Sequence, residues 1–369
     1  MKKTLVLALS AVLVLAFVGN CFADLNNGLV ARYTFDKCDA TDDSGNGNTG
    51  TIVGAPACVK GLKDNVLQFG GVYNRSYVSI PPSPSLAFLD NYTFTGWFNI
   101  QSNTSMDGWG RITEYGVHSI FAKAGDRNGL ITRTVRDTTD GLMRLMTYNG
   151  GLNLGNGTSI MTVDGFGLNE WHQVTVTSGD GLVKVYFDGK LQGSMATDLF
   201  NVNPLMVSEP LQLGIDQDAW WYPINGMLDD FRVYNRAISE SEVQDLYLGM
   251  IALPATIDVE PGTLNRKSKG QWVTAEIMLP QGYSAADIVI SSVNLFRING
   301  AALAQPLLAV GPSEIGDHTL NGIEDLEVKF DRQQLISLVS PGRTTLAVRG
   351  TLTDGTTFVG TAVITVIDR

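Results

Sequence analysis

The most informative part of the sequence is residues 226–239, which read Gly226-Met227-Leu228-Asp229-Asp230-Phe231-Arg232-Val233-Tyr234-Asn235-Arg236-Ala237-Ile238-Ser239. The aromatic and β-branched residues from Phe231 to Tyr234 predict a strand. A helix is predicted directly after it, because Ser239 and Glu242 have the spacing of a capping box, in which each side chain binds the other residue's backbone N–H. Three apolar residues then follow along one helix face, and Gly249 is expected to end the helix.

Short strands separated by glycine-rich turns account for most of the chain before this segment. Turn signals such as Asn149-Gly150, Asp180-Gly181 and Asp188-Gly189 are typical of tight connections between antiparallel strands. Many short strands with such turns indicate an all-β sandwich or jelly roll. The predicted strands are Leu29–Phe35, Val66–Phe69, Tyr77–Ile80, Tyr92–Ile100, Ser119–Lys123, Leu142–Tyr148, His172–Thr177, Val183–Phe187, Leu211–Gly214 and Phe231–Tyr234.

A second domain is predicted after the helix. Residues 251–255 are interpreted as a linker because they include Leu253-Pro254-Ala255, and the strand pattern begins again at Thr256. Five or more strands within about 115 residues suit a small immunoglobulin-like sandwich over 256–369. The strands expected there are Trp272–Leu279, Ile288–Arg297, Leu326–Phe330, Thr344–Leu352 and Ala362–Ile367.

Composition narrows the class of protein. The chain has 369 residues, of which 44% are hydrophobic and 17% are charged, and its formal net charge is −11. The hydrophobic content excludes a disordered chain, and the acidic balance argues against a nucleic-acid partner, which requires a basic face. The 40 glycines fit the many expected turns. Neutral ligands and bound cations are compatible with this composition.

The N-terminus has the pattern of an export signal. Lys2 and Lys3 precede an apolar run, Leu5–Val18, and a short segment then ends at Ala23. This pattern predicts a secretory signal peptide over 1–23, because the run is shorter than the roughly 20 residues that cross a bilayer. Acylation of Cys21, as in a lipoprotein, and an uncleaved anchor are the alternatives. Loss of the two lysines changes the charge from −11 to −13, and no later stretch is apolar enough to span a membrane.

Signal cleavage leaves Cys38 and Cys58 as the cysteines of the mature chain. Two cysteines that flank a Gly/Asn loop in an exported protein predict one disulfide. A disulfide that closes a loop of this size contributes on the order of 3 kcal/mol. Two free thiols are the alternative, whereas zinc is disfavoured because structural zinc takes four nitrogen or sulfur ligands.

Four segments of the first 250 residues form a recognisable series. They are Gly28–Phe35 with the loop Asp42–Gly50, Tyr92–Phe98, Glu170–Val174 with Tyr186–Lys190, and Gly226–Ser239. In this order they resemble the laminin G-like members of the concanavalin A-like lectin/glucanase superfamily. The resemblance spans residues 28–248 and implies a jelly-roll domain over 24–250, in which two curved antiparallel sheets pack face to face.

The remaining residues carry a second resemblance. Pro261–Asn265, Ser268–Gly270 and Thr351–Phe358 are similar to segments of an immunoglobulin-like module of exported bacterial proteins. The resemblance implies an immunoglobulin-like β-sandwich after the jelly roll, and it says nothing direct about a ligand.

The Asp/Asn/Gly loop at 42–50 is a candidate calcium site. Asp42, Asn46 and Asn48 offer oxygen atoms on a flexible backbone, which suits Ca²⁺. The resemblance implies a structural calcium ion that bridges this loop to Asp229 of the closing strand. Asp230 is the other candidate on that strand, although strict alternation would turn it to the opposite face. The alternative is a turn in which Asn and Gly only satisfy backbone angles.

A second acidic loop precedes the strand predicted at Leu326. Asp317, Asn321 and Asp325 fall at positions that resemble a calcium-binding loop, but Thr319 and Asn321 each replace an expected aspartate. Fewer negative charges weaken cation binding, so the alternative of a solvated turn stays open.

Aromatic residues in predicted loops are candidate ligand contacts. Trp220, Trp221 and Tyr222 are consecutive, and Trp109 lies between two glycines. Aromatic rings stack on the apolar faces of sugar rings and tolerate a wet surface, so these four residues are predicted to bind ligand. Burial of at least one tryptophan beneath a loop is the alternative.

Catalysis is disfavoured by what the sequence lacks. The three histidines have no Ser/Asp partners at the spacing of a catalytic triad. Glycosidases of this sandwich carry Glu-x-Asp-x-x-Glu on one strand, and residues 28–248 contain no such strand. The sequence therefore predicts an exported bacterial protein, extracellular or periplasmic, that binds carbohydrate or a cell-surface protein through its rim loops and holds structural calcium. A glycan-degrading enzyme and a purely structural envelope protein are the alternatives.

Overall fold

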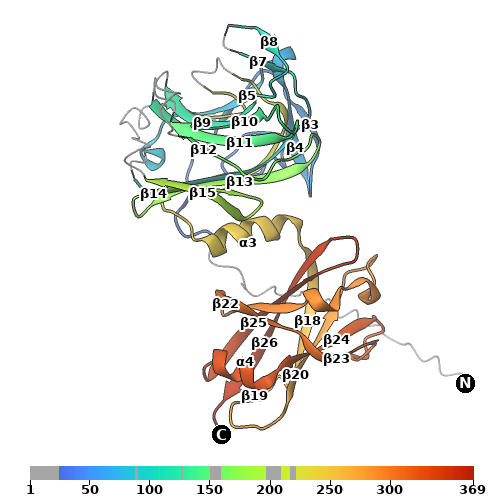
Figure 1. Cartoon of the computed structure of the whole chain (residues 1–369). Helices are drawn as coiled ribbons and strands as arrows, with labels where there is room; N and C mark the ends of the chain where they lie inside the picture. Colours follow the sequence, from blue (N-terminus) through green and yellow to red (C-terminus); the bar gives the residue numbers. More distant parts are fainter. Residues whose placement is uncertain are drawn as a thin grey trace, which may run out of the picture. The chain divides into compact units, whose positions relative to one another are not determined.

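The chain folds into two compact β units, which are divided in the sequence between Ala252 and Leu253. The computed structural model describes residues 25–87, 90–107, 109–125, 128–149, 159–196, 209–216 and 222–369. Strands make up most of both units (Figure 1), so the prediction of an all-β protein is confirmed.

One sheet of the first unit contains eight strands among the residues described. Its order is β15-β14-β13-β6-β17-β4-β3, and β1 also pairs with β17. Neighbours are antiparallel, so that Trp97 of β6 lies opposite both Gln173 of β13 and Asp229 of β17. The strands are β1 (Leu29–Tyr33), β3 (Ala57–Lys60), β4 (Asn65–Gly70), β6 (Tyr92–Ile100), β13 (Trp171–Gly179), β14 (Leu182–Phe187), β15 (Lys190–Ala196) and β17 (Asn225–Tyr234).

The second sheet has the order β12-β11-β10-β9-β16-β5-β2 over the described part of the chain. Its strands are β2 (Thr51–Val53), β5 (Tyr77–Ile80), β9 (Ser119–Gly125), β10 (Asn128–Arg136), β11 (Met143–Asn149), β12 (Ser159–Met161) and β16 (Leu211–Leu213). A short hairpin, β7 (Ser105–Met106) and β8 (Ile112–Thr113), stands apart from both sheets. Short single-turn helices cover Gly71–Tyr73 and Pro84–Leu86.

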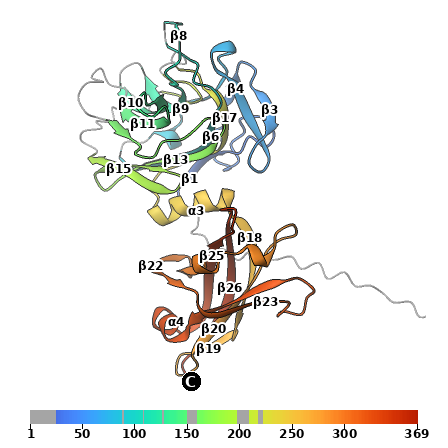
Figure 2. The ribbon, with the colours of Figure 1, turned by 45° about the vertical axis from the view of Figure 1, so that its right-hand side comes forward.

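A continuous apolar core joins the two sheets, which Figure 2 shows as facing layers. Phe121 of the second sheet packs its ring 5.3 Å from Phe94 and 5.4 Å from Phe231, which both belong to the first sheet. Side chains alternate between the faces of a strand, and the inward set is mostly apolar, with buried threonines on β10 and β11. Full burial of each such ring contributes roughly 1.5–3 kcal/mol.

Helix α3 (Glu240–Ile251) covers the outer face of the first sheet. Its capping box forms as predicted, because Ser239 Oγ accepts from the Glu242 N–H at 3.2 Å and Glu242 accepts from the Ser239 N–H at 2.7 Å. The ring of Tyr247 stacks on buried Trp97 at 5.5 Å. The helix continues two residues beyond Gly249, so the predicted end was wrong. Gly249 lies in open space, and nothing there forces the chain to turn.

The second unit holds a nine-stranded sheet in the described residues, ordered β22-β21-β25-β26-β18-β20-β24-β23, with β19 also paired to β26. The strands are β18 (Leu253–Glu260), β19 (Thr263–Asn265), β20 (Trp272–Met278), β21 (Asn294–Ile298), β22 (Ala301–Leu308), β23 (Val310–Gly316), β24 (Asp325–Asp331), β25 (Gly342–Thr351) and β26 (Thr357–Ile367). Helix α4 (Arg332–Leu338) and single turns at Ala285–Asp287 and Ile290–Ser292 complete it. Its own apolar core is separate from that of the first unit. The immunoglobulin-like assignment stays a prediction.

The linker predicted at 251–255 was wrong. Ile251 ends α3, Leu253 begins β18, and only Ala252 lies between them. The reason is pairing, because Leu253 lies opposite Phe358 in a parallel ladder between β18 and β26. Pro254 fits this position, since a strand at its first residues tolerates the missing N–H.

Candidate functional site

Trp109 lies at the tip of the β7–β8 hairpin, and 73% of its surface is exposed. The turn is held by Asp107, whose Oδ1 accepts from the backbone N–H groups of Trp109 (3.0 Å) and Arg111 (2.9 Å). Its Oδ2 accepts from Arg111 Nε at 2.6 Å. The Arg111 guanidinium lies 4.8 Å from the centre of the Trp109 ring. The tryptophan is therefore held at the surface, with a paired cation over its ring.

Tyr222, which the sequence also predicts as a ligand contact, lies beside this hairpin. Its N–H donates to the Met106 carbonyl at 3.2 Å, and its own carbonyl accepts from the Ser119 N–H at 2.9 Å. Burial raises the pKa of its phenol, on which the charges of Asp107 and Arg111 also act. The structure thus brings Trp109 and Tyr222 to one place. Trp220 and Trp221 lie outside the described residues.

Arg133 of β10 connects Tyr222 to the second sheet. Its guanidinium carbon lies 4.9 Å from the centre of the Tyr222 ring and 4.7 Å from that of Tyr148 on β11. Arg133 lies opposite Ser119 of β9, and strand alternation places it on the same face as Ile131. This face points away from the core between the sheets, because its other neighbours, Ala122, Ile131 and Tyr148, form a separate small cluster.

Asp216 is a carboxylate close to Arg133, Tyr148 and Tyr222, and these four residues are called the Arg133 cluster. Asp216 is fully buried, and its Oδ2 accepts from Ser119 Oγ at 2.6 Å. Burial raises its pKa to about 6, whereas the charge of Arg133 and the Ser119 hydroxyl act in the opposite direction. Asp216 Oδ1, Tyr148 OH and Arg133 Nε are buried without a hydrogen-bond partner in the part of the chain that the structure describes. Such unpaired polar atoms are costly in a folded protein and mark this cluster as a candidate binding site.

The loop predicted to hold calcium is ordered by Asp42 itself. Asp42 Oδ1 accepts from the backbone N–H groups of Arg32 (3.0 Å) and Ser44 (2.9 Å), and its Oδ2 accepts from that of Asn48 (2.9 Å). The Asn48 amide donates to the Val30 carbonyl at 2.7 Å, and its oxygen accepts from two serine hydroxyls. These contacts are those of the alternative interpretation, a turn whose polar side chains bind the loop's own backbone.

Asp229 and Asp230 of β17 lie on the same side of the strand, so the expected alternation was wrong. The register shifts between Asp229 and Arg232, and Asp230 has a φ of 38°. Such a bulge rotates one residue out of the alternating pattern. Asp230 is bound by Arg232 (2.7 Å) and by Arg32 (2.9 Å).

Both carboxylates line a cavity of about 190 Å³ beneath α3, together with Asp36 and Asp64. Burial and the negative charge of Asp230 raise the pKa of Asp229 to about 7, with further contributions from Asp36 and Asp64. Asp230 has a lowered pKa despite its burial, because two arginines contact it.

The side chains predicted to bind calcium already contact other groups of the domain. Both oxygens of Asp42 accept from N–H donors. Arg32 donates its backbone N–H to Asp42 and its guanidinium Nε to Asp230. Asn46 directs its amide N–H groups at the Leu29 carbonyl and at Ser44. Within the described residues, no three His, Cys, Asp or Glu side chains are close enough to hold a metal ion. Calcium remains a prediction.

Sequence comparison places residues 71–244 in a known family, because they match the laminin G-like model of the concanavalin A-like lectin/glucanases superfamily. The first unit is a concanavalin A-like domain. The resemblance expected from the sequence is therefore confirmed for this domain and leaves the second unit unassigned. No curated protein matches the chain.

Comparison with solved structures finds several likenesses. Domain 4 of an extracellular arabinanase from Geobacillus stearothermophilus, in complex with arabinotriose, is 23% identical, and the match covers 59% of this chain and 98% of that one at a TM-score of 0.44. The binding domain of botulinum neurotoxin DC, in complex with rat synaptotagmin II, is 12% identical. That match covers 89% of this chain and 72% of the other, at a TM-score of 0.44. The binding domain of Paraclostridial Mosquitocidal Protein 1 is 12% identical. That match covers 92% of each chain at a TM-score of 0.43. Because each TM-score is below 0.5, these likenesses say nothing of the ligand of this chain.

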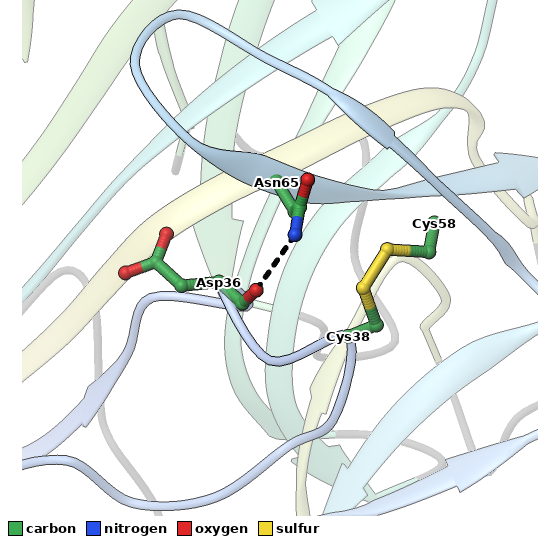
Figure 3. The surroundings of a disulfide bond; sticks show 4 residues. All are labelled: Asp36, Cys38, Cys58 and Asn65. Atoms are coloured by element: carbon green, nitrogen blue, oxygen red, sulfur yellow. Dashed lines mark hydrogen bonds between the residues drawn. A yellow bond between two sulfur atoms is a disulfide. The ribbon is translucent and has the colours of Figure 1, made fainter.

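The predicted disulfide forms between Cys38 and Cys58 in the concanavalin A-like domain. It joins the segment after β1 to β3, and Figure 3 shows it beside the hydrogen bond from the Asn65 amide to the Asp36 carbonyl. Two links of different chemistry therefore fasten the start of the 42–50 loop to the first sheet.

The second acidic loop connects β23 to β24, and its oxygens bind the loop's own backbone. Asp317 accepts from the N–H groups of Asn321 (2.9 Å) and Gly322 (3.0 Å), and Asn321 Oδ1 accepts from Ile323 (2.8 Å). Asp325 is fully buried and accepts from the N–H and Nδ1 of His318. These contacts describe a turn, and an ion at this loop stays a prediction.

His318 provides a pH-dependent contact in the second unit. Its hydrogen bond to Asp325 raises its pKa. We expect this pKa, measured from the histidine signals of the full chain in an NMR pH titration, to lie above 6.5 and to fall towards 6.5 in Asp325→Asn. The stability that the pair contributes is then complete below pH 6.5 and is lost as the pH rises through the raised value. An unchanged His318 pKa in Asp325→Asn contradicts the pairing.

Sequence reasoning missed Arg133 because β10 was not predicted as a strand. It missed Tyr148 and Asp216 as site residues although the strands Leu142–Tyr148 and Leu211–Gly214 were predicted. A usable signal for β10 was present: Leu130, Thr132 and Thr134 alternate with Ile131, Arg133 and Val135. This alternation marks a strand whose second face carries an arginine among apolar residues.

Proposed function

We propose that this chain is an exported, non-catalytic recognition protein whose concanavalin A-like domain binds glycan. The ligand docks where the β7–β8 hairpin and Tyr222 meet. A protein on a cell surface is the second kind of partner that the same rim accommodates.

The setting of Trp109 is the observation that carries this proposal. Its ring is largely exposed, yet its backbone and the Arg111 cation beside it are fixed by Asp107. A rigid exposed ring loses little entropy when a sugar stacks on it, so it is a good platform for carbohydrate. Tyr222, whose backbone is bonded to the hairpin, adds a second ring nearby.

The carboxylates of the domain support a non-catalytic role. Glycosidases use two carboxyl groups about 5–9.5 Å apart, and such neighbours strongly affect each other's pKa. The pKa of Asp216 is set by burial, Arg133 and Ser119, with no second carboxylate among the described groups that act on it. Asp230, which does lie beside Asp229, is bound by two arginines.

Export is supported by the disulfide, which forms and persists in oxidising compartments. The signal sequence predicted over 1–23 lies outside the described residues, as does Cys21. In the part of the chain that the structure describes, no helix has the length and apolar character needed to cross a membrane. Structural calcium belongs to this proposal only as a prediction, and Asp229 offers a test of it.

Glycan binding should depend on the Trp109 ring. On a glycan array, we expect the mature protein to bind a limited set of glycans and Trp109→Ala to lose at least about 10-fold in affinity, since a stacked ring contributes more than 1 kcal/mol. Tyr283→Ala is the matched control, because Tyr283 is a half-exposed aromatic residue of the other unit. Equal binding by Trp109→Ala and the unaltered protein, or no binding to any glycan, would sink the proposal.

A further inference from the structure

The guanidinium of Arg133 has a donor, Nε, that pairs with no group in the part of the chain that the structure describes. Its central carbon lies over the rings of Tyr148 and Tyr222, 4.7 and 4.9 Å from their centres, and its Nε is buried. Arg144 on the adjacent strand β11 forms ion pairs with two aspartates. Arg133 forms no ion pair with any of the described residues. Part of the Arg133 side chain reaches solvent.

This geometry suits one chemical class of ligand group. Aromatic rings on its flat faces hold a guanidinium in place but leave the N–H groups along its edge directed outward. That edge matches the two oxygens of a carboxylate or sulfate, which it binds through paired charge-assisted hydrogen bonds. A neutral hydroxyl group uses only part of this donor set.

We propose that Arg133 binds an acidic group of the glycan, a carboxylate or sulfate carried on a sugar ring that packs against Tyr222. The inference rests on the proposed glycan-binding function and makes Arg133 the residue that selects acidic over neutral sugars. The sequence itself does not favour anions, because its net charge is −11. Selection therefore has to come from a local cation such as this one.

The charges around Arg133 predict how binding responds to pH. Tyr148, Tyr222 and Asp216 face it from their respective segments, and the charges of Asp107 and Arg111 act on Tyr222 from the hairpin. An anion at Arg133 repels the ionised carboxylate of Asp216, whose pKa is about 6. Acidic ligands therefore bind more tightly at pH 5, where Asp216 is mostly protonated, than at pH 8.

Calorimetric titration of the full mature chain tests the proposal with three probes. These are an oligogalacturonide, which carries carboxylates, a sulfated dextran oligosaccharide and the unmodified dextran oligosaccharide. We expect one or both acidic probes to bind at least about 10-fold more tightly than the neutral one, and the carboxylate and sulfate arms identify the anion. Arg133→Gln should lose about 10- to 100-fold for the acidic probe, and Arg133→Lys, which keeps the charge but not the paired geometry, should lose less.

Two controls separate recognition from folding. Arg136→Gln removes a more exposed arginine of the same strand and should leave binding unchanged. Arg133→Lys should keep the Tm of the unaltered protein within a few degrees. Equal losses for neutral and acidic probes in Arg133→Gln, or a preference for the neutral probe, overturn the assignment of Arg133 while leaving glycan binding intact. Absence of binding in every arm, together with an array without binding, overturns the proposed function as well.

Discussion

Replacing Asp229 by asparagine is expected to raise the free energy of unfolding of the concanavalin A-like domain at pH 8 by up to about 4 kcal/mol. Asp229 is buried beside Asp230, and these two effects raise its pKa from 3.8 to about 7. A buried carboxylate that must ionise above pH 7 destabilises the folded state, and asparagine removes that charge. The Asp229 side-chain oxygen also accepts the Asp230 N–H at 2.7 Å, and the amide oxygen of asparagine can take its place.

The pH dependence identifies the cause. Because the pKa in the folded state is raised, the unaltered protein loses stability as the pH rises from about 4 to about 7. The gain in Asp229→Asn should therefore be near zero at pH 4 and complete above pH 7, as measured by urea unfolding at several pH values. Asp36→Asn, at the rim of the same cavity, is the control and should gain much less. A calcium ion bound by Asp229 reverses the sign: the protein is then stabilised by millimolar calcium, and Asp229→Asn is less stable in its presence.

Replacing Asp42 by alanine should destabilise the same domain by about 3–5 kcal/mol, with or without calcium. Three backbone N–H groups, those of Arg32, Ser44 and Asn48, lose their acceptor when this buried carboxylate is removed. Hydrogen bonds to a charged acceptor are the stronger kind, and a buried donor left unpaired incurs its full desolvation penalty.

The matched control is Asp43→Ala, one residue further along. Asp43 binds the exposed side chains of Thr34 and Lys37, so its loss should lower the free energy of unfolding by less than about 1 kcal/mol. Denaturant unfolding of both variants in EGTA measures the difference. Similar small effects for Asp42→Ala and Asp43→Ala would show that the loop does not depend on this carboxylate, and a large effect only when calcium is present would favour the metal.

The strands that the sequence predicted best are those with a simple alternation of apolar and polar residues. The prediction for Tyr92–Ile100 coincides with β6, and the end of β17 and the start of α3 follow from the capping box at Ser239. Strand β10 was not predicted, because its inward face carries the polar residues Thr132 and Thr134. These threonines satisfy their hydroxyl groups inside the core, Thr132 with Thr147 at 3.0 Å, so polar residues occupy buried positions.

The candidate site was predicted in part. Trp109 and Tyr222 could be proposed because aromatic residues in glycine-rich loops are visible in the sequence. Arg133, Tyr148 and Asp216 could not, since they come from three segments that only the pairing of β9, β10 and β11 and the path after β16 bring together. Similarly, the alternation rule failed at Asp230 because a bulge cannot be recognised from residue type alone.

In each unit the strand made last holds a central position. Strand β17 pairs with β1, β4 and β6, and β26 pairs with β18, β19 and β25. During synthesis the sheet that contains β17 and the sheet that contains β26 cannot close until these strands have left the ribosome. No other described strand pairs with their neighbours at the same place. We therefore expect a nascent chain of this design to complete each of these sheets late, which suits the proposed export because a secretory precursor reaches the translocation channel unfolded. For the export that we propose, late-closing sheets would delay folding and postpone the Cys38–Cys58 bond until the chain meets an oxidising compartment.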